Sequence, residues 1–367
     1  MKNPRLLSLD IFRGITIAFM IIVNNPGSWK YVYPPLRHAA WDGCTPTDLV
    51  FPAFLFIVGV SMWFSMRKYG HALNRSSLLK ILYRTSIIFL AGFLLHLFPF
   101  FGKDLATVRI MGVLQRIALA YGFGALACML VKKEHLWILL IALLGGYYGI
   151  MLLFGGSDPF SLEGNFSLRV DRLILGEAHL YRGFGIPFDP EGLLGTIPAI
   201  GTVIIGFLTG GLLGKGKANA VNVLKMVIYG AAAIVAGIIF SKVFPLNKPL
   251  WSSSYVLYTG GISMLILAFL YLVIDVLGIT FWTGFFRVFG VNALFIYILA
   301  GIWVKILLLI KIGAGAEAVS LYSWIYNTLC VPVFGNLNGS LFFAILQVLI
   351  LWVPAYLLYR KKIFIKV

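Results

Sequence analysis

The sequence predicts an all-α, polytopic membrane protein with about ten transmembrane helices. The 367-residue chain is 60% hydrophobic and only 12% charged, with a mean hydropathy of +0.94, whereas about a quarter of the residues in a soluble domain are charged. A helix needs about 20 mostly apolar residues to cross the hydrocarbon, and continuous rather than alternating apolar runs argue against a β-barrel. The runs of that length are 8–25, 48–66, 78–100, 109–131, 135–154, 193–214, 221–241, 252–277, 288–311 and 339–359.

Signals at the starts of several runs support these assignments. The first run lacks a following small-residue cleavage site, so we expect a retained helix rather than a signal peptide. Thr45 or Thr47 can cap the second run, where an aspartate, Asp48, is favoured by the helix dipole. The stretch "DPEG", which begins at Asp189, places an aspartate cap and a proline at the start of the sixth run.

Three connections are longer or more aromatic than a turn requires. Segments 26–47 and 155–191 are long, and 313–338 contains "LYSWIYNTLCVPVFGN". Long loops cost little stability and often carry function. We therefore expect one membrane domain, 1–367, with these outer loops around a site.

The basic residues predict the orientation. With loops assigned alternately to the two sides, the termini and even-numbered loops hold most of the 30 Lys and Arg, while most of the 13 acidic residues fall on the other side. The positive-inside rule then places both termini in the cytoplasm, most simply across a bacterial inner membrane. The net charge of +17 is thus an orientation signal and indicates no nucleic-acid partner.

A few polar residues within the runs are candidates for function. Asp10 and Arg13 share a helix face and can pair with each other or contact a ligand. Arg116 lies about 10 Å into its helix, where it can line a polar path with Arg13. For Gln115 and Asn24 the simpler interpretation is a hydrogen bond to a neighbouring helix.

The stretch "LRHAAWDGCTPTDLVFP", residues 36–52, lies between the first two runs and holds the strongest candidate. Two prolines and a glycine bracket His38, so the segment predicts a bent turn that presents one imidazole to a pocket. The chain's three cysteines have no metal-binding spacing, and we expect no metal. Cys44 and Cys330 fall on the same side and can pair, although free thiols are the simpler expectation.

Longer motifs point to a known family. "RLLSLDIFRGITIAFMIIVNN", "HAAWDGCTPTDLVFPAFLFIVGVSM", "RIMGVLQRIALAY", "FDPEGLLGTIPAI" and "NKPLWSSSYV" resemble the heparan-α-glucosaminide N-acetyltransferase family and its bacterial members, in order from residue 5 to roughly residue 300. "SLDIFRGI" is also similar to the broader group of transmembrane acyltransferases.

The resemblance implies transfer of an acetyl group from cytosolic acetyl-CoA to the amine of an amino sugar on the far side of the bilayer. The family's catalytic histidine and asparagine match His38 and Asn24. A histidine is the usual base at neutral pH, and an amide can donate to an oxyanion. Further predicted contacts are Arg13, Arg116, Asp10 and Gln115 with the coenzyme, and Trp41, Asp42, Asp48, Asp189 and Glu191 with the sugar.

Other interpretations stay open from the sequence. A secondary transporter or flippase of a sugar or glycan would also carry buried charges, although neither an inverted repeat nor a helix broken in mid-membrane is evident. A scaffold whose polar residues only join helices is a third. The last three runs offer apolar faces on which two copies could form a homodimer.

Overall fold

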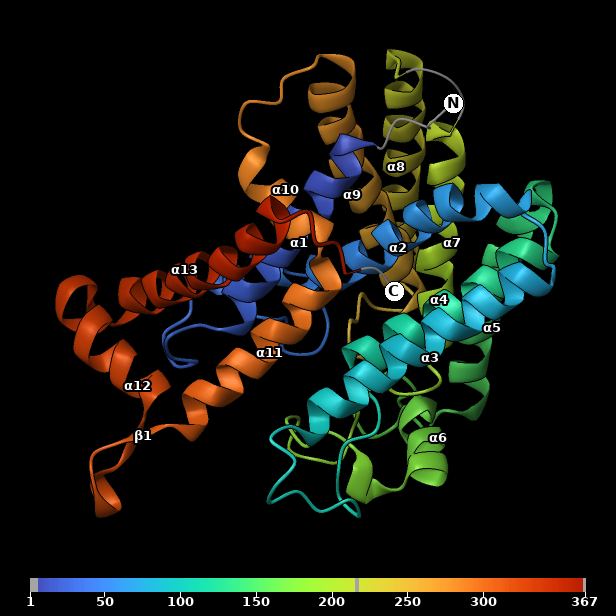
Figure 1. The fold of residues 1–367 in the computed structure, drawn as a ribbon. Helices are drawn as coiled ribbons and strands as arrows, with labels where there is room; N and C mark the ends of the chain where they lie inside the picture. The colour runs from blue at the N-terminus through green and yellow to red at the C-terminus, as the bar shows by residue number, and fades with distance from the viewer. Residues whose placement is uncertain (1–5, 215–217, 366–367) are drawn as a thin grey trace.

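The computed structural model describes residues 6–214 and 218–365 and is almost entirely helical (Figure 1). The only strands among these residues are β1 (Lys311–Ile312) and β2 (Val319–Ser320), which have two residues each and pair as an antiparallel hairpin. The α-helices are α1 (Leu7–Asn24), α2 (Val50–Met66), α3 (Arg75–Leu97), α4 (Val113–Leu130), α5 (Leu136–Phe154), α6 (Phe166–Leu175), α7 (Thr196–Leu213), α8 (Ala220–Phe240), α9 (Ser253–Tyr271), α10 (Gly284–Val291), α11 (Ala293–Leu309), α12 (Leu321–Ile325) and α13 (Val331–Arg360).

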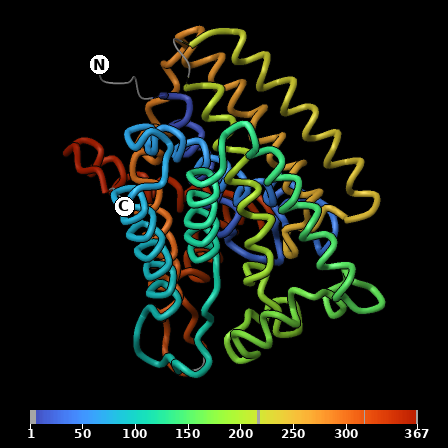
Figure 2. Tube along the Cα trace, turned by 90° about the vertical axis from the view of Figure 1, so that its right-hand side faces the viewer, coloured from blue at the N-terminus to red at the C-terminus, as the bar shows by residue number. Residues whose placement is uncertain are grey.

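The predicted membrane fold is confirmed. Within the described ranges, nine helices are long and apolar enough to span a bilayer, and the bent pair α10–α11 makes a tenth if it is counted as one span. The spans differ in burial: two-thirds or more of α1, α4 and α7 is buried, compared with about a fifth of α3, α5 and α8. The former are the more central helices, whereas α5 and α8 lie at the edge of the bundle (Figure 2). Exposed apolar side chains such as Leu82 on α3, Ile141 on α5 and Val235 on α8 are those expected of lipid-facing helices.

Close helix packing at the centre depends on small residues. At the contact between α2 and α7, a Cβ added to Gly59 would lie 2.1 Å from the carbonyl oxygen of Val203, and one added to Gly206 would lie 2.1 Å from that of Phe56. Small residues let helix backbones approach in this way in membranes, where van der Waals packing replaces the hydrophobic effect between helices. This contact fixes α2, which carries much of the site described below.

The structure corrects three details of the predicted topology. The ninth run is not one straight helix, because α10 and α11 meet at 85° with the break at Asn292. Residues 313–338 are not mainly loop, because α12, a five-residue π-helical turn and the start of α13 occupy most of them. Segment 155–191 also contains α6. Sequence patterns missed the break because the apolar run continues through it.

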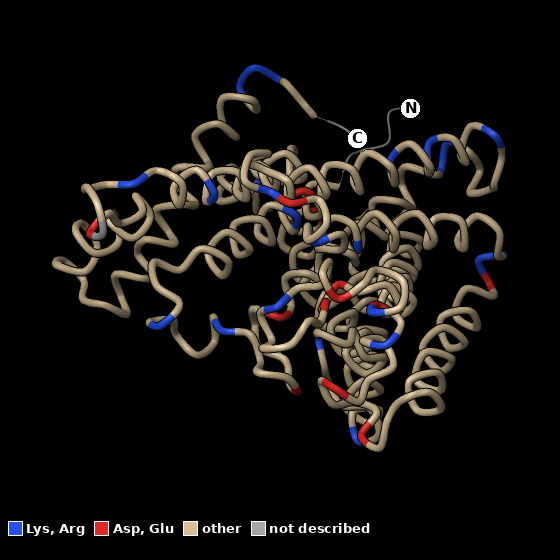
Figure 3. The backbone as a smooth tube through the Cα atoms, turned by 90° about the horizontal axis from the view of Figure 1, so that it is seen from below, with Lys and Arg blue, Asp and Glu red and all other residues tan. Residues whose placement is uncertain are grey.

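Charged residues are rare along the helices and lie mainly at helix ends and in loops (Figure 3). Burying an unpaired charge in hydrocarbon is costly, so the few charges inside the helical bundle indicate where polar chemistry takes place. The predicted pair is among them: Arg13 Nη1 lies 3.3 Å from Asp10 Oδ1 on α1.

Candidate active site

The segment that connects α1 to α2 folds back on the loop before α9. A short turn, Pro34–Leu36, is followed by Gly43 at φ 116°, a left-handed conformation that glycine adopts readily. The Gly43 N–H donates to the carbonyl of Leu246 at 2.6 Å, and the Asn247 side-chain amide donates to Asp42 Oδ1 at 3.1 Å. Two segments about 200 residues apart in the sequence therefore form one wall.

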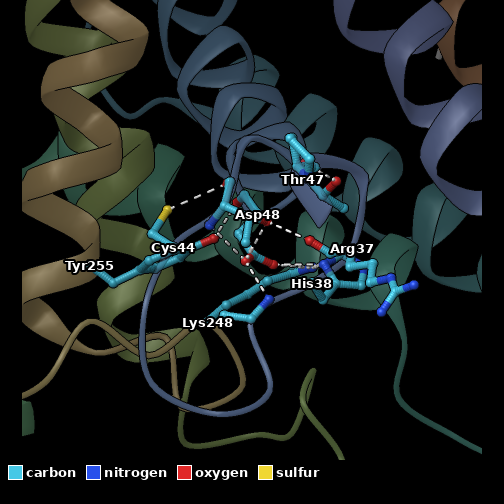
Figure 4. Close-up of polar contacts among 10 residues, drawn as sticks. Arg37, His38, Cys44, Thr47, Asp48, Lys248 and Tyr255 are labelled. Atoms are coloured by element: carbon cyan, nitrogen blue, oxygen red, sulfur yellow. Dashed lines mark hydrogen bonds and ion pairs between the residues drawn. The ribbon is translucent and has the colours of Figure 1, made fainter. Parts of the chain in front are cut away.

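His38 and Asp48 form a hydrogen-bonded pair in this wall (Figure 4). His38 Nδ1 lies 2.6 Å from Asp48 Oδ1, the His38 side chain is 43% exposed, and that of Asp48 is 1% exposed. A carboxylate accepts only, so Nδ1 carries the proton that it donates to Asp48. Nε2 is then the ring nitrogen left to accept a proton. It belongs to His38, the more exposed of the two side chains.

The second carboxylate oxygen of Asp48 is held by three donors. The N–H groups of Ala39 and Thr45 donate to Oδ2 at 3.0 and 3.1 Å, and the Thr45 hydroxyl does so at 3.0 Å. Thr45 and Asp48 thus form the helix-capping arrangement that the sequence predicted. The same contacts fix the carboxylate, so Asp48 positions the imidazole as well as capping the helix. The sequence did not indicate this second role.

Lys248 is a third member of the cluster, and its role was missed from the sequence. Its Nζ lies 3.4 Å from Asp48 Oδ1 and 3.0 Å from His38 Nδ1. Burial lowers the pKa of Lys248, and the neighbouring Asp48 carboxylate opposes this. The motif "NKPLWSSSYV" contains this lysine, but nothing in its spacing shows that it meets residues 200 positions earlier.

The imidazole faces a cavity of about 360 Å³, which we call the His38 cavity. Asn24, at the end of α1, is exposed on its lining, so the structure brings together the two residues that match the family's catalytic pair. The other residues on the lining include Phe51, Phe54, Arg109, Tyr181, Phe184, Glu191, Lys248 and Tyr297.

Arg109 forms ion pairs with Asp189 and Glu191, the two carboxylates that were predicted to contact the sugar. Its guanidinium donates to both oxygens of Asp189, at 2.8 and 2.7 Å, and to Glu191 at 2.5 Å. Burial acts to lower the pKa of Arg109, but these two carboxylates raise it above its ordinary value. Glu191 lines the cavity; Asp189 is buried behind Arg109 and does not. No local pattern predicts this pairing, because the partners are 80 residues apart.

Arg116 and Gln115 lie away from the place that the sequence predicted for them. Arg116 is 1% exposed, donates to the carbonyl of Gly192 at 2.7 Å and lies over the Trp251 ring at 5.5 Å. Gln115 is also buried, against α3 at Gly92. Neither residue lines the His38 cavity, because both side chains are packed against protein. Arg116 holds the turn that carries Glu191.

Trp41 and Asp42 also support the wall instead of lining the cavity. Trp41 Nε1 donates to the carbonyl of Phe160 at 2.9 Å, and its ring packs edge-on against Phe184 and Phe188. Asp42 is engaged by Asn247. Trp41 and Asp42 therefore hold the segments around the His38 cavity in place without lining it. Phe184, which packs against Trp41, does line the cavity.

A second cavity of about 400 Å³, the Arg13 cavity, lies further along α2. Arg13 lines it and donates to Ser61 Oγ at 2.7 Å and to the carbonyl of Gly290 at 3.2 Å. Two further cations, Lys80 and Arg84 on α3, also line it. Sequence reasoning found Arg13 but not these two, because they belong to a basic stretch that looks like an ordinary helix end.

The cysteines are free thiols, so the disulfide considered between Cys44 and Cys330 is not formed. Burial raises the pKa of the Cys44 thiol to about 12, with Asp48 adding to the effect. Such a thiol is a poor nucleophile. Within 6–214 and 218–365, no cluster of three or more His, Cys, Asp or Glu suits a metal ion.

Comparison with known proteins supports the resemblance. Residues 5–166 match the family model described as "Heparan-alpha-glucosaminide N-acetyltransferase, catalytic". The chain is 33% identical to heparan-alpha-glucosaminide N-acetyltransferase of Homo sapiens and 31% identical to that of Mus musculus, in each case over 80% of this chain. The chain is therefore similar in sequence to proteins of this family over most of its length.

The family model covers some of the residues around the two cavities but not others. His38, Asp48, Arg109 and the Arg13 cavity's cations fall within residues 5–166, whereas Glu191, Lys248 and Tyr297 lie beyond them. The chain spans about half the length of the curated relatives that it matches, 52% of the human protein and 53% of the mouse protein.

Proposed function

We propose that this chain transfers the acetyl group of cytosolic acetyl-CoA to the amine of an amino sugar on the opposite side of the membrane. The observation that carries the proposal is the His38–Asp48 pair, with a 2.6 Å contact and an exposed imidazole facing a cavity. The similarity to enzymes named N-acetyltransferases supports the same reaction.

Each step of the reaction has a residue in the His38 cavity. An amine is mostly protonated at neutral pH and attacks a thioester only as the free base. His38 Nε2 removes its proton while Asp48 holds Nδ1. The nitrogen then bonds to the thioester carbonyl carbon, Asn24 donates to the resulting oxyanion, the carbon–sulfur bond breaks, and the first proton passes from His38 to the CoA thiolate. His38, now neutral again, takes the second proton from the acylated nitrogen and releases it to water, which leaves the neutral amide.

Acetyl-CoA is proposed to enter through the Arg13 cavity and to leave its phosphates bound there. CoA carries several phosphate charges, and Arg13, Lys80 and Arg84 supply three cations on that lining. The predicted inside-positive orientation puts this end of α2 in the cytoplasm, with both termini. We further propose that the membrane is a bacterial inner membrane.

The test is acetyl transfer by purified protein with acetyl-CoA and glucosamine, measured as thiol release and as acetylated amine by mass spectrometry. General-base catalysis contributes roughly 10²- to 10⁴-fold, so His38→Ala is expected to lose that factor and still bind CoA. His135→Ala, an exposed histidine in a short turn remote from both cavities, is the matched control. Undiminished transfer by folded His38→Ala refutes the role.

The alternative mechanism, in which acetyl rests transiently on His38, gives a different kinetic signature. A burst of free CoA in the absence of acceptor, equal to the enzyme concentration, indicates the acetyl-histidine route. No burst indicates direct transfer. The His38–Asp48 geometry serves either route, because both require an unprotonated Nε2.

One observation favours a second candidate, a transporter of a sugar or glycan. The 85° break at Asn292 resembles the discontinuous helices of secondary transporters. Here the break borders the Arg13 cavity, and the Asn292 side chain holds Ile363 and Ile365 near the C-terminus. Uptake of unmodified glucosamine into proteoliposomes without acetyl-CoA would support transport over transfer.

A further inference from the structure

The His38 and Arg13 cavities share two lining residues, Phe54 on α2 and Tyr297 on α11. One face of α2 runs through both. Phe51 lines the His38 cavity, Val58 and Ser61 line the Arg13 cavity, and Phe54 lies between. This spacing of three to four residues is that of a single helix face, so the cavities lie in line, with two aromatic rings where they meet.

The boundary between the cavities is apolar, whereas each cavity carries charges at its far end. Apolar residues on the linings include Val113 of α4 in the His38 cavity, and Ile57 of α2 with Leu114 and Ile117 of α4 in the Arg13 cavity. Asp48, bonded to His38, is six residues or about 9 Å from Phe54 along the chain, and Ser61, bonded to Arg13, is seven residues or about 10 Å away. An apolar section of this kind resists ions and suits a neutral acyl thioester.

We propose that Phe54 and Tyr297 form an acyl gate, which closes the membrane between the two cavities and sets the largest acyl group that reaches His38. The gate rests on the proposed function, since the acyl end of the coenzyme is the part that must pass between the rings. A longer chain needs space that the rings occupy. Shortening a ring to a methyl group therefore opens the passage to longer acyl groups.

The first experiment measures acyl selectivity. We compare kcat/KM for butyryl-CoA and acetyl-CoA, with glucosamine as acceptor, in the unaltered chain and in Phe54→Ala. One methylene in an apolar pocket is worth roughly 10- to 200-fold in discrimination, so the butyryl-to-acetyl ratio is expected to rise at least tenfold. Phe64→Ala makes the same change on α2 away from both cavities and should leave the ratio unaltered.

The second experiment needs no enzymatic activity. Ser65→Cys places a thiol on the Arg13 cavity in a chain whose own cysteines, Cys44, Cys128 and Cys330, are replaced by alanine. A membrane-impermeant thiol reagent is added to sealed vesicles of each orientation. Labelling is expected in one orientation only, and in both once Phe54→Ala is added. Phe54→Leu, which keeps an apolar side chain without the ring, replaces Phe54→Ala if that variant does not fold.

The outcomes separate the gate from the function. An unchanged acyl ratio together with one-sided labelling in a folded Phe54 variant overturns the gate. Labelling from both sides in the parent chain also overturns it, even if acetyl transfer proceeds. Absence of any acetyl-CoA-dependent transfer refutes the proposed function, and the labelling then still decides whether the two rings close the passage.

Discussion

Replacing Asp48 with asparagine tests the link between geometry and chemistry most directly. The asparagine oxygen can still accept from the N–H groups of Ala39 and Thr45, which bind Oδ2 at 3.0 and 3.1 Å. The new amide NH₂ then faces His38 Nδ1, where Oδ1 was 2.6 Å away. Two donors cannot bond, so the imidazole shifts its proton to Nε2 and presents an N–H to the cavity.

This tautomer cannot accept the proton of an amine. The expected loss in kcat is therefore that of the general base, roughly 10²- to 10⁴-fold, or about 3–5 kcal/mol of transition-state stabilisation. The weaker hydrogen bonds at the helix cap cost about 1–3 kcal/mol of folding stability, which leaves a bundle of this size folded. Activity should thus fall far more than stability.

The assay is acetyl-CoA-dependent thiol release, with the thermal unfolding midpoint measured in the same detergent. Asp42→Asn is the matched control, because Asp42 lies in the same segment and bonds Asn247, not His38. It should retain near-normal kcat. Full activity in Asp48→Asn, or equal losses in the two variants, would show that Asp48 does not set the tautomer of His38.

Three further predictions concern the scaffold, each read from the thermal midpoint. Arg109→Met leaves the buried carboxylate of Asp189 unpaired and should cost about 3–5 kcal/mol; an unchanged midpoint contradicts the pairing. Burial raises the pKa of Asp171 from 3.8 to about 7, so the native state holds a proton that the unfolded chain releases, and stability falls as pH rises from about 4 to 7. Asp171→Asn should flatten that dependence between about pH 4 and 7, and equal slopes in both proteins argue against it. Gly206→Leu should separate α2 from α7 and lower the midpoint sharply, whereas Gly145→Leu, with open space around its Cβ, should not; equal effects refute the close packing.

The sequence by itself determined the membrane class and the approximate number of spans. Both depend on apolar runs about 20 residues long, a signal that does not depend on how the helices pack. Local signals were equally informative: the cap at Thr45 and Asp48 and the Asp10–Arg13 pair involve residues three apart on one helical turn, and both are present. Motif resemblance singled out His38 and Asn24, which line one cavity.

Only the tertiary structure decided what surrounds the imidazole and which polar residues face open space. Lys248 meets His38 across 210 positions, and Arg109 reaches Asp189 across 80. The side of α4 that carries Arg116 packs against Trp251 and the interior, whereas Lys80 and Arg84 of α3 lie on the lining of the Arg13 cavity. An apolar run predicts that a helix crosses the bilayer. It does not predict which face of the helix packs against a neighbour, because lipid and protein interior are equally apolar. That choice is made when the helices pack, and the site follows from it.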